Sequence, residues 1–156
     1  MDRGLLRELK QKKPFAHPEE ELFLSLVRTA DLLGRKPSQL FKERGISPEQ
    51  YNVLRILRGA GPKGLPCGEI AVRMVTRDPD ITRLLDRLEA RRLVTRARAD
   101  GDRRVVSTRI TPAGLVLLKP LDQLLVDIHM GQLGFLTAKV IRSLLGRLAK
   151  IRERLG

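Results

Sequence analysis

Apolar side chains recur at helical spacing along most of the chain, which predicts a mainly α-helical protein. The first such segment follows Pro18, and its first turn is acidic because residues 19–21 are all glutamate, as a helix N-terminus favours. Its apolar positions are Leu22, Phe23, Leu26, Val27, Ala30 and Leu33. Gly34 and Pro37 then interrupt the pattern, so we expect this helix to end or to kink before Leu40.

Three later helices are predicted from one common start signal, a side chain that can cap a helix followed by proline. The pairs are Ser47-Pro48, Asp78-Pro79 and Thr111-Pro112. The capping oxygen accepts a hydrogen bond from a free backbone N–H, and proline suits the first helical position because it has no N–H. The predicted helices are 48–58, 79–91 and 112–130, together with a short helix at 67–74 and a final one at 137–155.

The order of the middle elements indicates a winged helix-turn-helix. The helix at 67–74, a tight turn and the helix at 79–91 have the arrangement of a helix-turn-helix motif. Two segments of strand-forming residues follow at 93–98 and 105–110, separated by an Asp-Gly-Asp turn, which predicts a β-hairpin that serves as the wing. We therefore expect a mostly α fold with a small β-hairpin wing, flanked by N- and C-terminal helices.

The charge balance points to a polyanionic partner. The 156 residues suffice for one compact domain, or for a small domain with helical extensions. Lys and Arg number 31 against 18 Asp and Glu, which gives a net charge of +13 and favours nucleic acid or an anionic membrane. Four Phe, one Tyr and no Trp offer few surfaces for base stacking, which argues against single-stranded nucleic acid as the main target.

Other classes of function lack their sequence signatures. Cys67 is the single cysteine, so we expect no disulfide within the chain, no zinc cluster and no cofactor. The chain has neither a glycine-rich phosphate loop nor a nucleophile elbow, so an enzyme is not expected. The first residues are too charged for a signal peptide, and no apolar run approaches about 18 residues. We therefore expect a cytoplasmic protein without a membrane partner.

One face of the helix at 79–91 is predicted to anchor it, and the opposite face to be free for a partner. The anchor positions fall at i, i+3, i+4 and i+7 and are Ile81, Leu84, Leu85 and Leu88. The positions that point away are Arg83, Asp86 and Arg87, with Asp80 and Thr82 on the flanks. The start of such a helix enters the major groove, and here that tip is Arg77, Asp78, Pro79 and Asp80.

Two interpretations of these charges stay open on the helix alone. Arg83 has the geometry to bridge O6 and N7 of guanine, and Asp80 can accept from N4 of cytosine. Alternatively, the arginines pair with acidic residues of their own helix on a solvated face. In the hairpin turn, Arg103 and Arg104 lie beside Asp102 on a finger narrow enough for a minor groove, where phosphates concentrate negative potential. Charged turns are usually just solvated, but together with the basic excess this one favours DNA.

The stretch 46–114 resembles the multiple-antibiotic-resistance regulator (MarR) family of bacterial winged-helix transcription factors. The resemblance rests on the segment 81–89 (ITRLLDRLE), on Asp102-Arg103-Arg104 and on the segment 110–114 (ITPAG). It implies a homodimer that offers two recognition helices and two wings to a pseudo-palindromic operator in double-stranded DNA. It also implies that Asp102 orients Arg104 toward the minor groove and that Arg83 is the recognition-helix arginine. Many relatives carry Ser, Lys or Thr where this chain has residues 78–80 (DPD), so the resemblance implies no base preference.

The chain is expected to divide into four parts. They are a basic flexible arm at 1–17, an N-terminal dimerisation helix at 18–45, the winged helix-turn-helix DNA-binding domain at 46–111, and C-terminal dimerisation helices at 112–156. The terminal helices are long and carry apolar stripes that a single small winged domain cannot cover, so a second copy of the chain is the expected partner. Folding back onto their own chain is the alternative. For the arm, contact with DNA phosphates and a solubilising tail both remain open.

The resemblance further implies a response to a signal, because family members commonly respond to small aromatic or phenolic compounds or to oxidants. A ligand would lie between the dimerising helices and the winged domain, with Tyr51 and His129 as walls of its pocket. Cys67 opens a short helix, and a helix N-terminus can lower the pKa of a thiol. Oxidation sensors of the family usually keep their cysteine near the chain start, so an inert thiol is the preferred interpretation. The histidines show no carboxylate spacing that would indicate a metal site.

The leading hypothesis is a sequence-specific regulator of transcription, a repressor that a ligand releases from DNA. A non-specific basic nucleic-acid-binding protein would explain the charge equally well. The third hypothesis is a winged helix used purely for protein interaction or dimerisation. Such a module does not need a cluster of arginines like Arg83, Arg87, Arg103 and Arg104.

Overall fold

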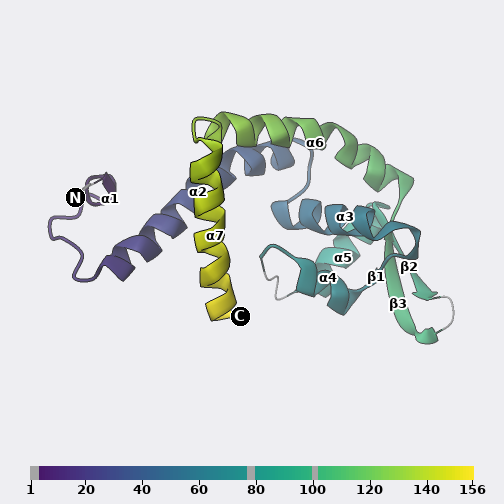
Figure 1. The fold of residues 1–156 in the computed structure, drawn as a ribbon. Coiled ribbons are helices and arrows are strands. Elements are labelled where there is room, and N and C mark those ends of the chain that lie inside the picture. The colour runs from purple at the N-terminus through teal and green to yellow at the C-terminus, as the bar shows by residue number, and fades with distance from the viewer. Residues whose placement is uncertain (1–3, 77–79, 100–101) are drawn as a thin grey trace.

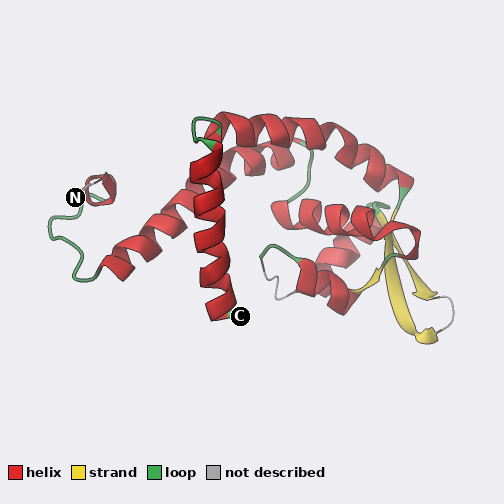
Figure 2. Ribbon diagram, in the orientation of Figure 1, coloured by secondary structure: helices red, strands yellow, loops and turns green. Residues whose placement is uncertain are grey.

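The computed structural model describes residues 4–76, 80–99 and 102–156, with the backbone alone at 99 and 102–105. Its helices are α1 (Gly4–Glu8), α2 (Pro18–Glu43), α3 (Pro48–Ala60), α4 (Cys67–Arg73), α5 (Ile81–Ala90), α6 (Pro112–Leu133) and α7 (Ala138–Leu155), with a 3₁₀ turn η1 (Gly61–Lys63) after α3. The strands β1 (Leu65–Pro66), β2 (Val94–Ala99) and β3 (Asp102–Ile110) form one antiparallel sheet in the order β1-β3-β2. The predicted mostly helical fold with a β wing is confirmed (Figure 2).

The core of the winged domain lies where α3, α4, α5 and the sheet meet the first half of α6. Its fully buried side chains include Leu54, Leu57, Ile70, Leu85, Leu88, Leu118 and Leu121. Each such side chain stabilises the fold by about 1.5–3 kcal/mol through removal from water. The predicted caps of α3 and α6 are confirmed: Ser47 and Gln50 form a reciprocal capping box, and the Thr111 hydroxyl accepts from the backbone N–H of Gly114.

Two of the predicted helix boundaries change: of the two alternatives for the helix after Pro18, its ending at Gly34 or Pro37 is wrong, and α5 begins two residues later than expected. α2 does not stop at Gly34 or Pro37 but continues to Glu43 with Pro37 inside it, and Phe41 at its end is buried in the core. Burial of this last turn outweighs the hydrogen bond that proline cannot donate. The helix α5 begins at Ile81, and its cap is Asp80, which accepts from the N–H of Arg83; the expected cap at 78 lies outside the described residues. The apolar spacing of α5 does not choose between two aspartates that both suit the cap.

The hairpin predicted from the sequence gains a third strand. Leu65 and Pro66 pair with Thr108 and Ser107 of β3. Gly64 leads into this strand with φ +65, and a Cβ at that residue would collide with the backbone oxygen of Thr108. A two-residue strand that contains proline has no alternating pattern to reveal it, and proline is tolerated because it lies at the sheet edge.

The long helices extend away from the winged domain (Figure 1), and many of their apolar side chains are exposed. α2 and α6 pack on each other and on α3, whereas α7 leaves α6 at a bend of 100° and buries none of its residues. The chain exposes 12041 Å², where a compact monomer of 17.6 kDa exposes roughly 7,900 Å². Within the described part, no single helix is long and apolar enough to cross a membrane, although α6 and α7 pass together by length and composition.

Candidate nucleic-acid interface

The helix α5 has the two faces that its sequence predicted. Leu84, Leu85 and Leu88 are buried in the domain core. The predicted contact residues Thr82, Arg83 and Arg87 are exposed, and so is Asp86. The helix therefore presents a polar, net basic surface to solvent from an anchored apolar face, as a helix that enters a DNA groove requires.

The structure places Arg83 beside Asp80. The Nε of Arg83 lies 3.2 Å from Oδ2 of Asp80, and the side chain of Arg83 is 76% exposed. An exposed ion pair of this kind contributes only about 0–1 kcal/mol, because water screens it and two side chains lose freedom. The pairing expected on a solvated face is thus present, and it is weak enough for Arg83 to exchange Asp80 for a base edge or a phosphate.

Arg96 of β2 joins the wing to α5, and sequence reasoning missed it. Its Nη2 lies 2.7 Å from Oδ1 of Asp86 and donates to the backbone oxygen of Thr82 at 3.3 Å, and its Nε lies 3.6 Å from Oε2 of Glu89. Its backbone N–H donates to Oε1 of Glu89 at 3.1 Å. These three partners stand at i, i+4 and i+7 on α5, so one guanidinium lies along the helix and fixes the wing against it. We call this set of contacts the Arg96 clamp.

The remaining predicted DNA contacts fall where the structure gives no side-chain position. Residues 77–79, which include Arg77, Asp78 and Pro79, lie outside the described residues. The side chains of the wing residues Asp102, Arg103 and Arg104 also lie outside the described part, although their backbone belongs to β3. Their contacts with DNA stay predictions.

A cavity of about 590 Å³ lies between α2, α3, α6 and the segment that follows α4. The structure brings the two predicted pocket residues together here, because Tyr51 and His129 both line it. The ring of Tyr51 stacks on that of Phe41, with centroids 4.5 Å apart, and this pair forms one apolar wall. We call this space the α3–α6 cavity.

An ion pair in the wall of the α3–α6 cavity ties the winged domain to α6. Arg58 of α3 donates two hydrogen bonds to Asp122 of α6, at 2.7 and 2.9 Å. The hydrogen bond from Arg58 lowers the pKa of the Asp122 carboxyl, and the same bond raises the pKa of Arg58. The two residues are 64 positions apart, so no local pattern in the sequence indicates that they meet.

Cys67 lies at the start of α4, half-buried, in the wall of a smaller cavity of about 230 Å³ that Thr82, Arg96 and Val106 also line. Among the described residues, no three His, Cys, Asp or Glu side chains gather in a way that could hold a metal ion.

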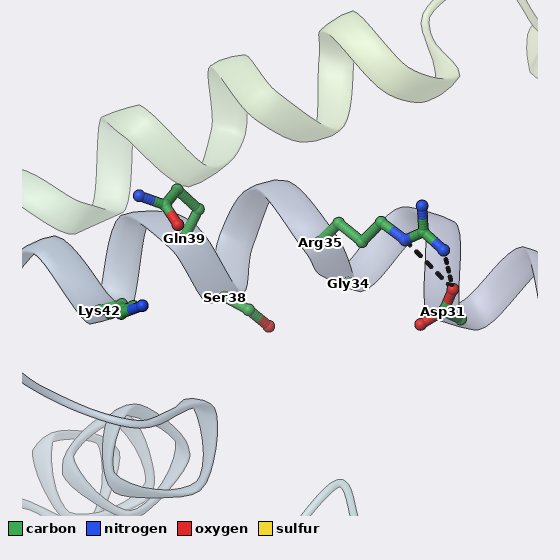
Figure 3. Close-up of a pocket in the computed structure, with 6 residues that line it drawn as sticks. All are labelled: Asp31, Gly34, Arg35, Ser38, Gln39 and Lys42. Carbon is green, nitrogen blue, oxygen red and sulfur yellow. Dashed lines mark hydrogen bonds and ion pairs between the residues drawn. The ribbon is translucent and has the colours of Figure 1, made fainter.

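A further hollow, of about 490 Å³, lies on the surface of α2 (Figure 3). Its lining residues are Asp31, Gly34, Arg35, Ser38, Gln39 and Lys42, and Arg35 pairs with Asp31 at 2.6 Å. One helix supplies the whole lining and none of it comes from the winged domain, so this hollow is an open helix face.

Comparisons with known proteins agree with this geometry. The model of the MarR family matches residues 44–105, from the end of α2 into β3. A MarR transcription factor from Planctomyces limnophilus is 40% identical, covers 88% of this chain and 99% of its own, and superposes with a TM-score of 0.65. This chain belongs to the MarR family.

More distant relatives share the fold. S. aureus MepR, solved in complex with DNA, is 21% identical with a TM-score of 0.75 over 90% of this chain and 99% of its own. The organohalide-sensing regulator RdhR, in its 2,4-dichlorophenol-bound form, is 15% identical with a TM-score of 0.80 over 92% of this chain and 87% of its own. The MarR-family chain described here is a DNA-binding transcriptional regulator and not an enzyme, as its sequence predicted.

Proposed function

We propose that this MarR-family protein is a sequence-specific repressor that binds a pseudo-palindromic operator in double-stranded DNA as a homodimer, and that a small aromatic or phenolic effector releases it. The observation that carries the proposal is the arrangement of α5, with Arg83 and Arg87 exposed on the face opposite its buried leucines and Arg96 fixing the wing beside it. Two groups held in a fixed relation can enter two grooves of one duplex together.

The uncovered apolar surface supports a homodimer. On α2 it comprises Leu22, Phe23, Leu26 and Val27, and on α7 it comprises Val140, Ile141, Leu144, Leu145, Ile151 and Leu155. Because α7 buries none of its residues, packing within one chain leaves this surface in water. The exposed area exceeds that of a compact monomer by roughly 4,000 Å² per chain, which is more than an obligate dimer needs, since its two partners together bury about 2,000–5,000 Å².

The charges on these two helices are complementary. The first turn of α2 is acidic, with Glu19, Glu20 and Glu21. The helix α7 is basic, and its cations are Lys139, Arg142, Arg147, Lys150, Arg152 and Arg154 against the single Glu153. Packing of α2 from one copy against α7 from the other would bring opposite charges together, and a two-fold axis would repeat the contact.

The α3–α6 cavity supports the effector. The stacked rings of Phe41 and Tyr51 suit a planar aromatic molecule, and Arg55 supplies a cation for an acidic hydroxyl or carboxylate. The cavity lies between the winged domain and the long helices, so an occupant touches both. RdhR, which shares the fold, has been solved with 2,4-dichlorophenol bound.

A regulator of this kind acts on the chromosome, which places it in the cytoplasm.

Selection of bound duplexes from a random pool tests the DNA part of the proposal. We expect a palindrome whose half-sites lie one helical turn apart, bound about 10³-fold or more tighter than random duplex. Affinity without such a preference, lost steeply with added salt, would instead identify a non-specific basic DNA-binding protein.

The variant Arg83→Ala tests whether α5 recognises the base sequence of the operator. It should cost about 1–3 kcal/mol at the preferred site and relax the preference at one base pair, because a guanine contact is lost. Arg73→Ala is the matched control: Arg73 lies on α4 of the same domain and pairs with Glu69 at 3.3 Å, much as Arg83 pairs with Asp80. The control variant should at most weaken binding to all duplexes by the same factor. An equal loss at all sequences for Arg83→Ala would make Arg83 a phosphate contact.

Sedimentation tests the proposed homodimer, and titration with 2,4-dichlorophenol tests the proposed effector. A dimer is expected at concentrations where the operator is bound, and a monomer on DNA would contradict the proposal. The phenol should lower operator affinity in the wild-type protein, and Tyr51→Ala should weaken that response, because the aromatic wall of the cavity is removed.

A further inference from the structure

One residue in the wall of the α3–α6 cavity holds the segment that leads to the DNA-reading helix. The side-chain oxygen Oδ1 of Asn52 accepts a hydrogen bond from the backbone N–H of Val75 at 2.8 Å. Asn52, Val75 and Thr76 all line the cavity. Val75 stands five positions before Asp80, the N-cap of α5. Within the described residues, the end of this segment is thus part of the cavity wall, and the Asn52 side chain ties it to α3.

We propose that Asn52 is a positioning residue for operator binding: from the cavity wall it fixes the backbone at Val75, five positions before the N-cap of α5, so that a cavity occupant and operator binding depend on the same hydrogen bond. The inference rests on the proposed DNA-binding function, and it adds the residue through which occupancy of the cavity would reach the DNA.

The acceptor side of this bond belongs to a rigid part of the molecule. Asn52 lies on α3 next to Val53 and Leu54, both of which have no exposed surface. The same helix is held at its start by the capping box of Ser47 and Gln50. The backbone of Asn52 therefore has little freedom, and its amide is presented from a fixed point.

The donor side belongs to the short segment after α4, of which residues 75 and 76 are exposed. The helix α4 ends at Arg73, and Met74 already has an extended backbone with φ −63 and ψ 139. The side chain of Val75 is 81% exposed, and Thr76 is exposed as well. Met74 packs against the core and holds the start of this segment, and the hydrogen bond to Asn52 then ties the backbone of Val75 to α3.

The position of Asn52 gives the effect on DNA a direction. Arg55 lies one helical turn beyond Asn52 on α3 and lines the same cavity. A hydroxyl group drawn in by this cation would lie within reach of Asn52 and would donate to its Oδ1 in competition with the N–H of Val75. Because coupling between two sites is reciprocal, an occupant that weakens the bond lowers operator affinity by the same factor by which the operator lowers affinity for the occupant.

Removal of either partner of the bond tests the inference without any ligand. Asn52→Leu keeps the size of the side chain and removes the acceptor, whereas Asn52→Asp keeps an oxygen in its place. A single hydrogen bond of this type corresponds to about a three- to tenfold change in an equilibrium constant. We expect Asn52→Leu to bind operator about three- to tenfold more weakly, and Asn52→Asp to remain close to the wild type at physiological salt.

Val75→Pro tests the bond from the donor side, since proline has no N–H, and the extended Met74 is the conformation that a residue before proline prefers. The double variant of Asn52→Leu and Val75→Pro should bind operator no more weakly than the single variants, because both remove the same bond. Hydrogen exchange at the Val75 amide should speed up in Asn52→Leu and not in Asn52→Asp.

The outcomes separate this inference from the proposed function. If the wild type prefers an operator and Asn52→Leu binds it equally well, the positioning role is wrong while the DNA-binding proposal stands. If Asn52→Leu and Asn52→Asp lose affinity equally, or if the effects of Asn52→Leu and Val75→Pro add, the shared bond is not the cause. A wild type that prefers no duplex would overturn the proposed function itself.

Discussion

The Arg96 clamp predicts that one substitution outside the recognition helix weakens DNA binding. Arg96 is 22% exposed and contacts Asp86, Glu89 and the backbone of Thr82 along one face of α5. In Arg96→Ala these contacts disappear, while the backbone bond from residue 96 to Glu89 remains available. The wing and α5 should then move more freely relative to each other, and two groups that must enter two grooves lose their fixed spacing.

The structure sets the size of this effect. The 2.7 Å contact with Asp86 is charge-assisted, and bonds of that kind contribute about 1.5–3 kcal/mol. The carboxylates of Asp86 and Glu89 are 55% and 42% exposed, so water reduces the contribution to about 1–2 kcal/mol. The free energy of unfolding should fall by this amount, with a decrease in Tm of about 2–8 °C. Operator affinity should fall as well, by at most about 5- to 30-fold, because the freed wing and α5 must be brought back to one spacing on the duplex.

Operator binding and thermal unfolding of Arg96→Ala, Arg96→Lys and Arg35→Ala measure this effect. Arg35→Ala removes the same charge and a 2.6 Å ion pair with Asp31 on α2, away from the winged domain, so it reports the cost of losing a charge and an ion pair that do not join the wing to α5. Lysine keeps the charge at 96 but cannot span the three partners, so Arg96→Lys should also bind weakly. Wild-type affinity for Arg96→Lys, or equal losses for Arg96→Ala and Arg35→Ala, would refute the clamp.

Two further predictions concern stability. Asp122→Asn should destabilise the protein at neutral pH, because it removes the ion pair with Arg58. Arg58 lowers the folded-state pKa of Asp122 below the unfolded value of about 3.9. The stability that the ion pair contributes is therefore present above this value and is lost as pH falls through the lowered pKa. Urea unfolding of both proteins between about pH 6 and pH 3 should therefore show the difference shrinking toward acid, and a constant difference would contradict the ion pair. Gly64→Ala should cost about 1–3 kcal/mol, because φ is +65 and the added Cβ meets the oxygen of Thr108. Gly59→Ala, in open space on α3, should instead stabilise the protein by about 0.5–1 kcal/mol. Chemical denaturation measures both variants, and an equal loss of stability in the two would contradict the clash with Thr108 as the cause.

Local signals in the sequence were sufficient for most of the elements. The caps at Ser47 and Thr111 depend on atoms within one turn of chain, and both are present as predicted. The buried face of α5 follows from spacing alone, because a helix that must bury Leu84, Leu85 and Leu88 turns its charges outward. Proline as a stop signal was misleading in α2. Pro37 lies inside this helix, whose last turn the core holds through the buried Phe41.

The cavity and the contacts around it were only partly predictable. Tyr51 and His129 were placed at a pocket by family resemblance, and both line the cavity. Nothing in the sequence singled out Asn52 or Arg58, whose partners stand 23 and 64 positions away. A polar residue on a predicted helix has many potential partners at such separations, and only the packing of the helices selects one of them.

The sequence by itself determined the helices, the wing, the basic character and the outward face of α5, because each depends on composition or on neighbours within a few residues. Tertiary structure alone decided that Arg96 spans α5, that Arg58 reaches Asp122, and that Asn52 meets Val75 at a cavity. These contacts join elements distant in the chain, and their geometry is set by how the buried leucines pack, which side-chain spacing along one strand or helix does not encode.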